Sequence, residues 1–456
     1  MSDTPTEPTP PTSHYSSAAP PETVVNPVAP EAPQKPSGKG AKRSGVGIVV
    51  VAAAVAAIVG GVSGAGIGIA AYANNNPSGS VASNTTGATS VTVNDKKNAT
   101  TITAVAAKAS PSVVTINVTA SSEAGTGSGI ILTSDGYVLT NTHVVTLDGA
   151  TATPKIQVET NDGRLLSAKV VGTDPTDDLA VIKLQNVSGL QPAQFADSSK
   201  LNVGDMAVAI GAPLGLSGTV TDGIISALNR SITVQSSAAP SGGDSSNGGS
   251  GSGSGSSPFN FWNFGGQGGT QSQTPSTSAQ STVSLSVIQT DADINPGNSG
   301  GALLDSSGKV IGVNCAIASA SDSSSSGGQS GSIGVGFAIP SNVAVRIADD
   351  IIKNGSATHG LLGASVTDVT TDGSATTSKT VGALVKSVVS GGAADKAGIK
   401  ANDVITNFNG IPITNANDLT AQVRVLAADS KASITYVRDG HTTNTSVVLG
   451  ELPTQS

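Results

Sequence analysis

The sequence predicts a mainly β protein, in which an all-β sandwich or barrel is followed by a smaller α+β unit. Short apolar runs begin after residue 110 and are separated by glycine-rich turns, a pattern typical of such architectures. Helical spacing of apolar residues is nearly absent before residue 343. The predicted strands of the first region include residues 112–118, 129–132, 137–139, 156–159, 168–171 and 179–184.

Two helices are expected, one closing the first region and one within the second. Apolar and charged residues mix at helical spacing over 343–352, just before Gly355. In the second region, Asn415 supplies an N-cap for a helix over 415–427. The predicted domains are 99–353 and 358–452.

The N-terminal segments are expected to lie outside both domains. Residues 1–45 are rich in proline and almost lack large apolar side chains, which predicts a disordered tail. Residues 46–73 carry no charge and are long enough to span a bilayer as a helix, and 74–98 form a polar linker. Basic residues precede the apolar segment, so the positive-inside rule places the N-terminus in the cytoplasm and both domains outside it. Cleavage by signal peptidase after Ala73 is the alternative.

Composition excludes several classes of function. Charged residues make up 12% of the chain and its net charge is −8, so it lacks the basic surface that nucleic acids require. Cys315 is the single cysteine, which rules out a disulfide within the chain, and its apolar surroundings predict a buried residue. The four histidines are too far apart in sequence for a metal-ligand motif. We therefore expect no nucleic acid, no metal and no cofactor.

Two segments interrupt the first domain. Residues 236–282 are rich in Gly, Ser, Gln and Asn and predict a long flexible surface loop, and 319–332 predict a shorter one. Within the longer loop, residues 259–264 hold four aromatic side chains. This aromatic cluster fits surface packing, a contact with a membrane or partner, or a tethered plug for a groove of the protein.

A histidine, an aspartate and a serine occur in motifs that carry chemistry. Ser299 lies within Gly-Asn-Ser-Gly-Gly (297–301), where flanking glycines let backbone N–H groups turn toward a developing oxyanion. His143 follows an apolar strand, and an imidazole can take a proton from a serine and return it. An aspartate before the strand at 179–184 would hold the histidine in one tautomer. Each motif alone fits a turn or a structural residue, but the order His, Asp, Ser is that of the chymotrypsin arrangement.

Longer stretches around these residues resemble the HtrA/Deg family of serine proteases, over about residues 100–450. The stretches are Asn-Thr-His-Val-Val (141–145), Asp-Leu-Ala-Val (178–181), Gln-Thr-Asp-Ala (289–292), Gly-Asn-Ser-Gly-Gly-Ala-Leu (297–303) and Gly-Phe-Ala-Ile-Pro (336–340). The resemblance implies two six-stranded β-barrels, an active site in the cleft between them, and a following PDZ domain.

The same resemblance assigns roles to single residues. His143 is the general base and acid, Asp178 orients it, and Ser299 is the nucleophile. Asp178 is preferred to Asp177 because it directly precedes Leu-Ala-Val. The implied oxyanion hole is formed by Gly297, Asn298 and Ser299. The implied substrate pocket is lined by Ile294, Ala318 and Val335. The implied binding loop for a peptide carboxylate is formed by Leu361, Leu362 and Gly363.

The function implied by the resemblance is a membrane-anchored, extracytoplasmic serine endopeptidase that cleaves unfolded or misfolded proteins in quality control. Its PDZ domain would bind peptide C-termini. The alternative is a PDZ-based chaperone or scaffold whose protease barrel is weakly active or inactive. Family members often form trimers through aromatic residues before the protease barrel, but none lies between Tyr72 and Tyr137 here. Homo-oligomerisation therefore stays open.

Overall fold

The structure, a computed structural model, describes the two predicted domains and little of the chain before them. The described residues are 91, 93, 98–120, 123–212, 218–236, 281–315, 334–370 and 380–453. The predicted tail, membrane span and aromatic cluster (1–45, 46–73 and 259–264), the loop at 319–332 and nearly all of the predicted linker at 74–98 lie outside them. Within the described part of the chain, no helix combines the length and the apolar character needed to cross a membrane.

The first barrel confirms all six strands expected before residue 185. Its strands are β1 Val113–Thr119, β2 Ala124–Ile131, β3 Tyr137–Thr140, β4 Lys155–Glu159, β5 Leu165–Asp174 and β6 Leu179–Leu184. They close in the order β1-β2-β3-β6-β5-β4. A short helix, α4 (Thr142–Thr146), follows β3 directly. The apolar residues that alternate along these strands fill the barrel, because neighbouring side chains of a strand point to opposite faces.

The second barrel has the same number of strands. They are β7 Met206–Gly211, β8 Thr219–Ser236, β9 Ser281–Thr290, β10 Ala302–Leu304, β11 Val310–Cys315 and β12 Gly336–Pro340. The barrel closes in the order β10-β11-β12-β9-β8-β7. Antiparallel pairing of β8 with β9 continues to Ser236 and Ser281. Residues 236, 281 and 282, at the ends of the predicted loop 236–282, therefore belong to the paired strands instead.

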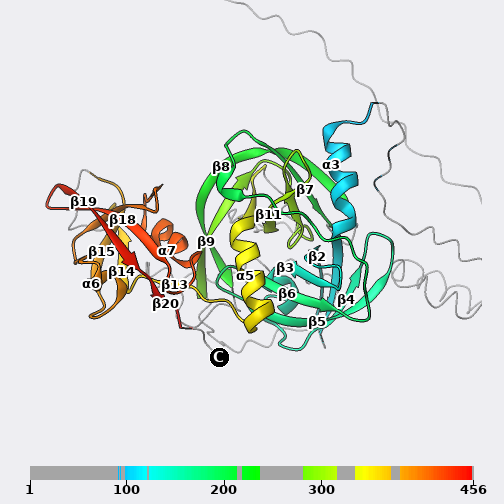
Figure 1. Ribbon diagram of the computed structural model, residues 1–456, viewed down its shortest axis with the longest axis horizontal. Helices are drawn as coiled ribbons and strands as arrows, with labels where there is room; N and C mark the ends of the chain where they lie inside the picture. Colours follow the sequence, from blue (N-terminus) through cyan, green and yellow to red (C-terminus); the bar gives the residue numbers. More distant parts are fainter. Residues whose placement is uncertain are drawn as a thin grey trace, which may run out of the picture. The chain divides into compact units, whose positions relative to one another are not determined.

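A shared apolar core joins the two barrels. It contains residues of β2, β3 and β6 from the first barrel and of β7, β10, β11 and β12 from the second. The helix α5 (Ser341–Asn354) packs on this core and contacts strands of both barrels (Figure 1). It ends as expected at Gly355, whose φ of 83° satisfies the left-handed C-cap conformation. The two barrels are thus held together by one apolar core.

The helix α3 (Thr101–Ala109), which precedes the first barrel, was not expected from the sequence. The side chain of Thr100 caps it by accepting a hydrogen bond from the Thr103 N–H. Its buried face consists of Val105, Ala106 and Ala109, which pack on the shared core. Such small side chains produce a weak helical pattern, so packing against the barrels decides the conformation.

The second domain is an α+β unit with its own core. A sheet has the order β14-β15-β16-β18-β19, β17 pairs with β16, and β13 pairs with β20. The strands are β13 Gly360–Leu361, β14 Ala364–Asp368, β15 Ala383–Val388, β16 Val404–Phe408, β17 Ile411–Pro412, β18 Lys431–Arg438, β19 His441–Val448 and β20 Gly450–Glu451. The helices are α6 Ala393–Lys396 and α7 Ala416–Arg424, and 3-10 turns lie at Ser110–Ser112 and Ser198–Lys200.

The predicted helix near residue 415 is confirmed, with Asn415 as its cap. The Asn415 side chain accepts from the Asp418 N–H at 2.9 Å, and Asp418 in turn accepts from the Thr414 N–H at 3.0 Å. The first bond satisfies an N–H group that the first turn of a helix leaves unpaired, and the second ties the residue before the cap to the helix. The helix ends three residues earlier than expected, at Arg424.

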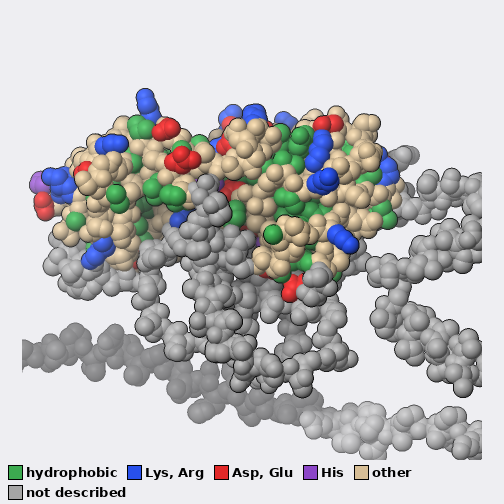
Figure 2. Space-filling model, turned by 90° about the horizontal axis from the view of Figure 1, so that it is seen from below, with side chains coloured by type: hydrophobic (Ala, Val, Ile, Leu, Met, Phe, Trp, Pro, Cys, Tyr) green, Lys and Arg blue, Asp and Glu red, His purple; other side chains and the backbone are tan. Residues whose placement is uncertain are grey.

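The surface carries few charges, as the composition requires. On the face shown in Figure 2, basic and acidic side chains are interspersed among uncharged polar and hydrophobic ones.

Candidate active site

The helix α4 brings His143 against Asp178. The Nδ1 atom of His143 lies 2.6 Å from Oδ2 of Asp178, and the His143 backbone N–H donates to Oδ1 of the same carboxylate at 3.0 Å. The imidazole is buried, with 6% of the side chain exposed. Two contacts from one histidine therefore fix the carboxylate, and an Nδ1–H donated to it makes Nε2 the basic nitrogen.

The backbone of Asp178 is in a conformation that side-chain-bearing residues rarely adopt. Its φ is +51°, in the left-handed region. The Asp178 carbonyl accepts from the side-chain amide of Asn141 at 2.7 Å and from the Thr142 N–H at 3.2 Å. The residues just before His143 thus hold the turn that presents its carboxylate partner.

The preference for Asp178 over Asp177 agrees with where the two carboxylates point. Asp178 contacts His143, whereas Oδ2 of Asp177 lies 3.5 Å from Nδ1 of another histidine, His359. Adjacent residues of a turn point in different directions, so the sequence alone offers no geometric means of choosing between them.

The loop of Ser299 is tied to the first barrel although it belongs to the second. The Ser128 N–H in β2 donates to the Ser299 carbonyl at 2.8 Å, and the Ser128 hydroxyl donates to the Gly297 carbonyl at 2.7 Å. Thr140, at the end of β3, donates to the Ser128 carbonyl at 2.7 Å. The bonds connect the loop of Ser299 to the strand that ends just before His143. The three predicted residues are therefore brought to one region between the barrels.

Close packing explains a glycine in this loop. Gly300 has a φ of +81°, and a Cβ added there would collide with the Ser128 carbonyl and the Thr140 hydroxyl. Only a residue without a Cβ lets the two backbones approach this closely. The Asn298 N–H donates to the Asn295 carbonyl at 2.9 Å, so it is used within the loop. The oxyanion role of the neighbouring N–H groups stays a prediction.

Nothing in the sequence indicated that two further residues lie near the pair formed by His143 and Asp178. Cys315 is buried as expected, but its Sγ also lies 3.6 Å from Oδ2 of Asp178. Burial and the Asp178 charge raise the pKa of this thiol well above its ordinary value, so it stays a neutral donor. Asp148 follows α4, and burial raises the pKa of its carboxyl to about 6. Neither residue lies in a motif that indicated chemistry.

The structure describes two of the three residues predicted to line the substrate pocket. Ile294 is buried in the second barrel, and its side chain packs so closely on Gly336 that a Cβ there would come within 2.9 Å of it. Val335 is half-buried and precedes Gly336. Ala318 lies outside the described residues. Ile294 thus lies against the residue that follows Val335, and the role of the predicted positions in substrate selection stays a prediction.

The predicted carboxylate-binding loop lies beside the end of α7. The Gly360 N–H donates to the Leu426 carbonyl at 2.7 Å. Leu361 is partly exposed, Leu362 is buried in the domain core, and Gly363 has a φ of +71°. A backbone loop next to a helix is the arrangement that receives a peptide end in such domains. Contact of these residues with a peptide carboxylate remains a prediction.

Comparisons with known proteins agree with this architecture. Residues 127–313 match the trypsin-like peptidase domain family, and residues 360–449 match the PDZ domain family. The chain is 41% identical over 336 residues to the serine protease PepD of Mycobacterium tuberculosis, covering 73% of this chain and 62% of PepD. It is 39% identical over 326 residues to the periplasmic serine endoprotease DegP of Escherichia coli, covering 71% of this chain and 56% of DegP.

The chain thus spans less than two thirds of the length of these relatives, but nearly all of a related solved structure. The HtrA-type protease AlgW, solved with a tripeptide, is 31% identical, with a TM-score of 0.51 over 77% of this chain and 98% of that one. The chain therefore belongs to the HtrA/Deg family of trypsin-like proteases that carry a PDZ domain.

Proposed function

We propose that this protein is an extracytoplasmic serine endopeptidase that cleaves unfolded or misfolded proteins, with His143, Asp178 and Ser299 as its catalytic residues. The observation that carries the proposal is the buried contact of 2.6 Å between His143 and Asp178, next to the strand that binds the Ser299 loop. The relatives named above as proteases support the same reaction.

The proposed reaction proceeds through an acyl-enzyme. Nε2 of His143 accepts the hydroxyl proton as Oγ of Ser299 attacks the scissile carbonyl, and backbone N–H groups at Gly297 and Ser299 stabilise the oxyanion. The imidazolium then gives this proton to the leaving amine. Water deprotonated by the same histidine hydrolyses the acyl-enzyme and frees Ser299. Asp178 keeps the ring in place and stabilises its charged form throughout.

We propose two further roles for segments beyond the barrels. The PDZ domain binds the C-termini of substrates or activating peptides through residues 361–363 and α7. The uncharged segment 46–73 anchors the chain in the membrane with the N-terminus in the cytoplasm. If it does, an alkaline carbonate wash should leave the full-length chain in the membrane pellet.

A covalent probe tests the protease proposal on the full-length chain. Diisopropyl fluorophosphate should phosphorylate Ser299 with loss of fluoride, which mass spectrometry would locate, and cleavage of unfolded casein should fall in proportion to the labelled fraction. A chain that binds casein but neither takes the label nor cleaves would be a peptide-binding chaperone instead. A peptide with an amidated C-terminus, compared with its free acid, tests the PDZ role separately.

Cleavage is expected to decline as the pH falls through the pKa of His143. Burial acts to lower this pKa, but the charge and hydrogen bond of Asp178 outweigh it, and Asp148 adds to the rise above the ordinary value. Because only neutral imidazole can accept the serine proton, kcat/KM should drop tenfold per pH unit below that pKa.

The variant Asp148→Asn tests the electrostatic contribution. It removes a negative charge that favours the imidazolium, so the acid limb of the kcat/KM profile should move to lower pH. The exposed Asp162→Asn variant serves as the control and should leave the limb in place. A shift toward higher pH in Asp148→Asn would contradict the assignment of His143 as the base.

A further inference from the structure

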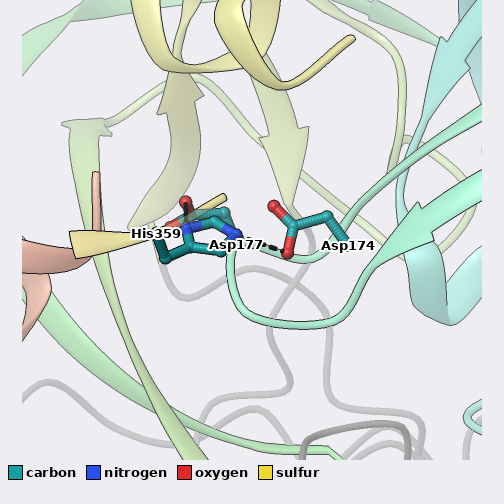
Figure 3. Close-up of side chains that lie close together, drawn as sticks. All are labelled: Asp174, Asp177 and His359. Atoms are coloured by element: carbon teal, nitrogen blue, oxygen red, sulfur yellow. Dashed lines mark hydrogen bonds and ion pairs between the residues drawn. The ribbon is translucent and has the colours of Figure 1, made fainter. Parts of the chain in front are cut away.

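A second histidine and carboxylate cluster lies next to the catalytic turn. Asp174 ends β5, Asp177 lies in the turn that follows, and His359 lies between α5 and β13 (Figure 3). One ligand atom from each of the three lies within 4.8 Å of the others. Nε2 of His359 is 2.9 Å from Oδ1 of Asp174. None of these three side chains takes part in the proposed reaction.

The cluster is buried and incompletely bonded. The side chains of Asp174, Asp177 and His359 are 4%, 3% and 4% exposed. Among the described residues, Oδ2 of Asp174 and Oδ2 of Asp177 make no hydrogen bond. A buried carboxylate oxygen is costly unless a donor or a cation satisfies it. The Oδ2 atom of Asp177 lies 3.5 Å from Nδ1 of His359, too far for a good hydrogen bond.

Two oxygen atoms lie near Nδ1 of His359, the Arg424 carbonyl at a hydrogen-bond distance and Oδ2 of Asp177 farther away. Its separation of 3.5 Å from Oδ2 of Asp177 is long for a hydrogen bond. Two ligands on one tetrahedral ion, with bonds of about 2.1 Å, are separated by about 3.4 Å. The carbonyl oxygen of Arg424 lies 2.9 Å from the same Nδ1 and would supply the third ligand atom.

The other ring nitrogen has the partner that a metal-binding histidine requires. Histidine ligands generally donate their second N–H to a carboxylate or carbonyl, which fixes the tautomer and the orientation of the ring. Here Asp174 accepts from Nε2, and its Oδ1 also accepts from the Thr176 N–H at 3.1 Å. Asp174 is therefore an orienting residue and Asp177 the carboxylate ligand.

We propose that His359 Nδ1, Asp177 Oδ2 and the Arg424 carbonyl bind one divalent transition-metal ion of the Zn²⁺ class. An imidazole with a carboxylate favours such an ion over Ca²⁺ or Mg²⁺, which prefer oxygen ligands alone. The ion takes the place of the proton on Nδ1, and water completes its coordination. It links the segment after α5 and the end of α7 to the turn that leads into Asp178.

The competing arrangement has no metal. In it, a protonated His359 donates Nε2–H to Asp174 and Nδ1–H to the Arg424 carbonyl. The charges of Arg346 and Arg424 also act on Asp177. However, Arg346 shares its charge with Asp350, at 3.2 Å, and donates to the Thr358 carbonyl at 3.0 Å. A measurement of bound metal separates the two arrangements.

The test uses the full-length chain with Ser299→Ala, so that proteolysis cannot interfere. After EDTA treatment and dialysis, added ZnCl2 should be retained at one ion per chain by elemental analysis. Zinc at about 100 times its Kd should raise the thermal midpoint by about 5 °C. Cobalt(II) at the same site should show the intense visible bands of a low-coordinate ion with a nitrogen ligand.

Substitutions of the three cluster residues test whether these residues bind the zinc ion. Asp177→Asn, which is nearly isosteric, and His359→Gln should abolish retention and the thermal shift, and Asp174→Asn should weaken binding about 10-fold to 100-fold. The matched control is His441→Gln, which removes an exposed histidine at the start of β19 and should bind zinc fully. Midpoints measured in EDTA show whether each variant folds.

Three results would contradict the proposed metal site. If the Ser299→Ala chain retains no zinc and shows no cobalt bands, the cluster is a proton-bridged ion pair. If zinc is retained to the same extent after Asp177→Asn, the ion lies elsewhere on the chain. A thermal shift with CaCl2 that equals the shift with ZnCl2 contradicts the assigned ion class.

Discussion

Replacing Ser299 with alanine is expected to lower the kcat for casein cleavage by about 10⁶-fold. The variant removes the only atom that forms the acyl bond in the proposed reaction. The residue is fully buried, and its carbonyl is held by the Ser128 N–H, so removal of one oxygen should leave the loop intact. Binding of casein should persist, and the loss should appear in kcat rather than in KM.

An exposed serine supplies the matched control. Ser306 lies in the turn between β10 and β11, and Ser306→Ala should cleave casein at the unaltered rate. Cleavage by the Ser299→Ala chain at a rate close to that of the unaltered chain would exclude Ser299 as the nucleophile. Circular dichroism of both variants should be unchanged, which separates loss of chemistry from loss of fold.

Replacing Asp178 with asparagine is expected to lower kcat by about 10⁴-fold. The carboxylate accepts hydrogen bonds from the ring and the backbone N–H of His143 at 2.6 and 3.0 Å. An asparagine that keeps the backbone bond presents its NH2 group to Nδ1. The ring then has its proton on Nε2, where it cannot accept the proton of Ser299.

A double variant tests whether the two residues act as a unit. Because residues of one catalytic group are strongly non-additive, Ser299→Ala with Asp178→Asn should be no slower than Ser299→Ala alone. Rates that multiply would mean that Asp178 contributes independently of the nucleophile. The matched carboxylate control, Asp162→Asn in the exposed turn after β4, should retain nearly full activity.

Much of the fold could be predicted because local signals and tertiary packing agree. The apolar residues of β1 and β6 become buried as their sequence pattern predicts, whereas those of β5 stay partly exposed. The helix before Gly355 and the helix after Asn415 have ends specified by their own caps. The helix α3 was missed because its small apolar residues give a weak pattern, and the barrels alone provide the surface that stabilises it.

The sequence by itself determined which residues of the triad to expect, since a histidine, an aspartate and a serine lie in three motifs in a recognisable order. It could not determine their contacts. Cys315 lies 137 positions from Asp178, and His359 lies 185 positions from Asp174, yet each pair is in contact. Local sequence patterns describe neighbours along the chain, whereas closure of two barrels around a shared core sets distances between segments far apart in sequence. For that reason the histidines seemed too scattered for a metal site, and only the tertiary structure placed one of them between two buried carboxylates.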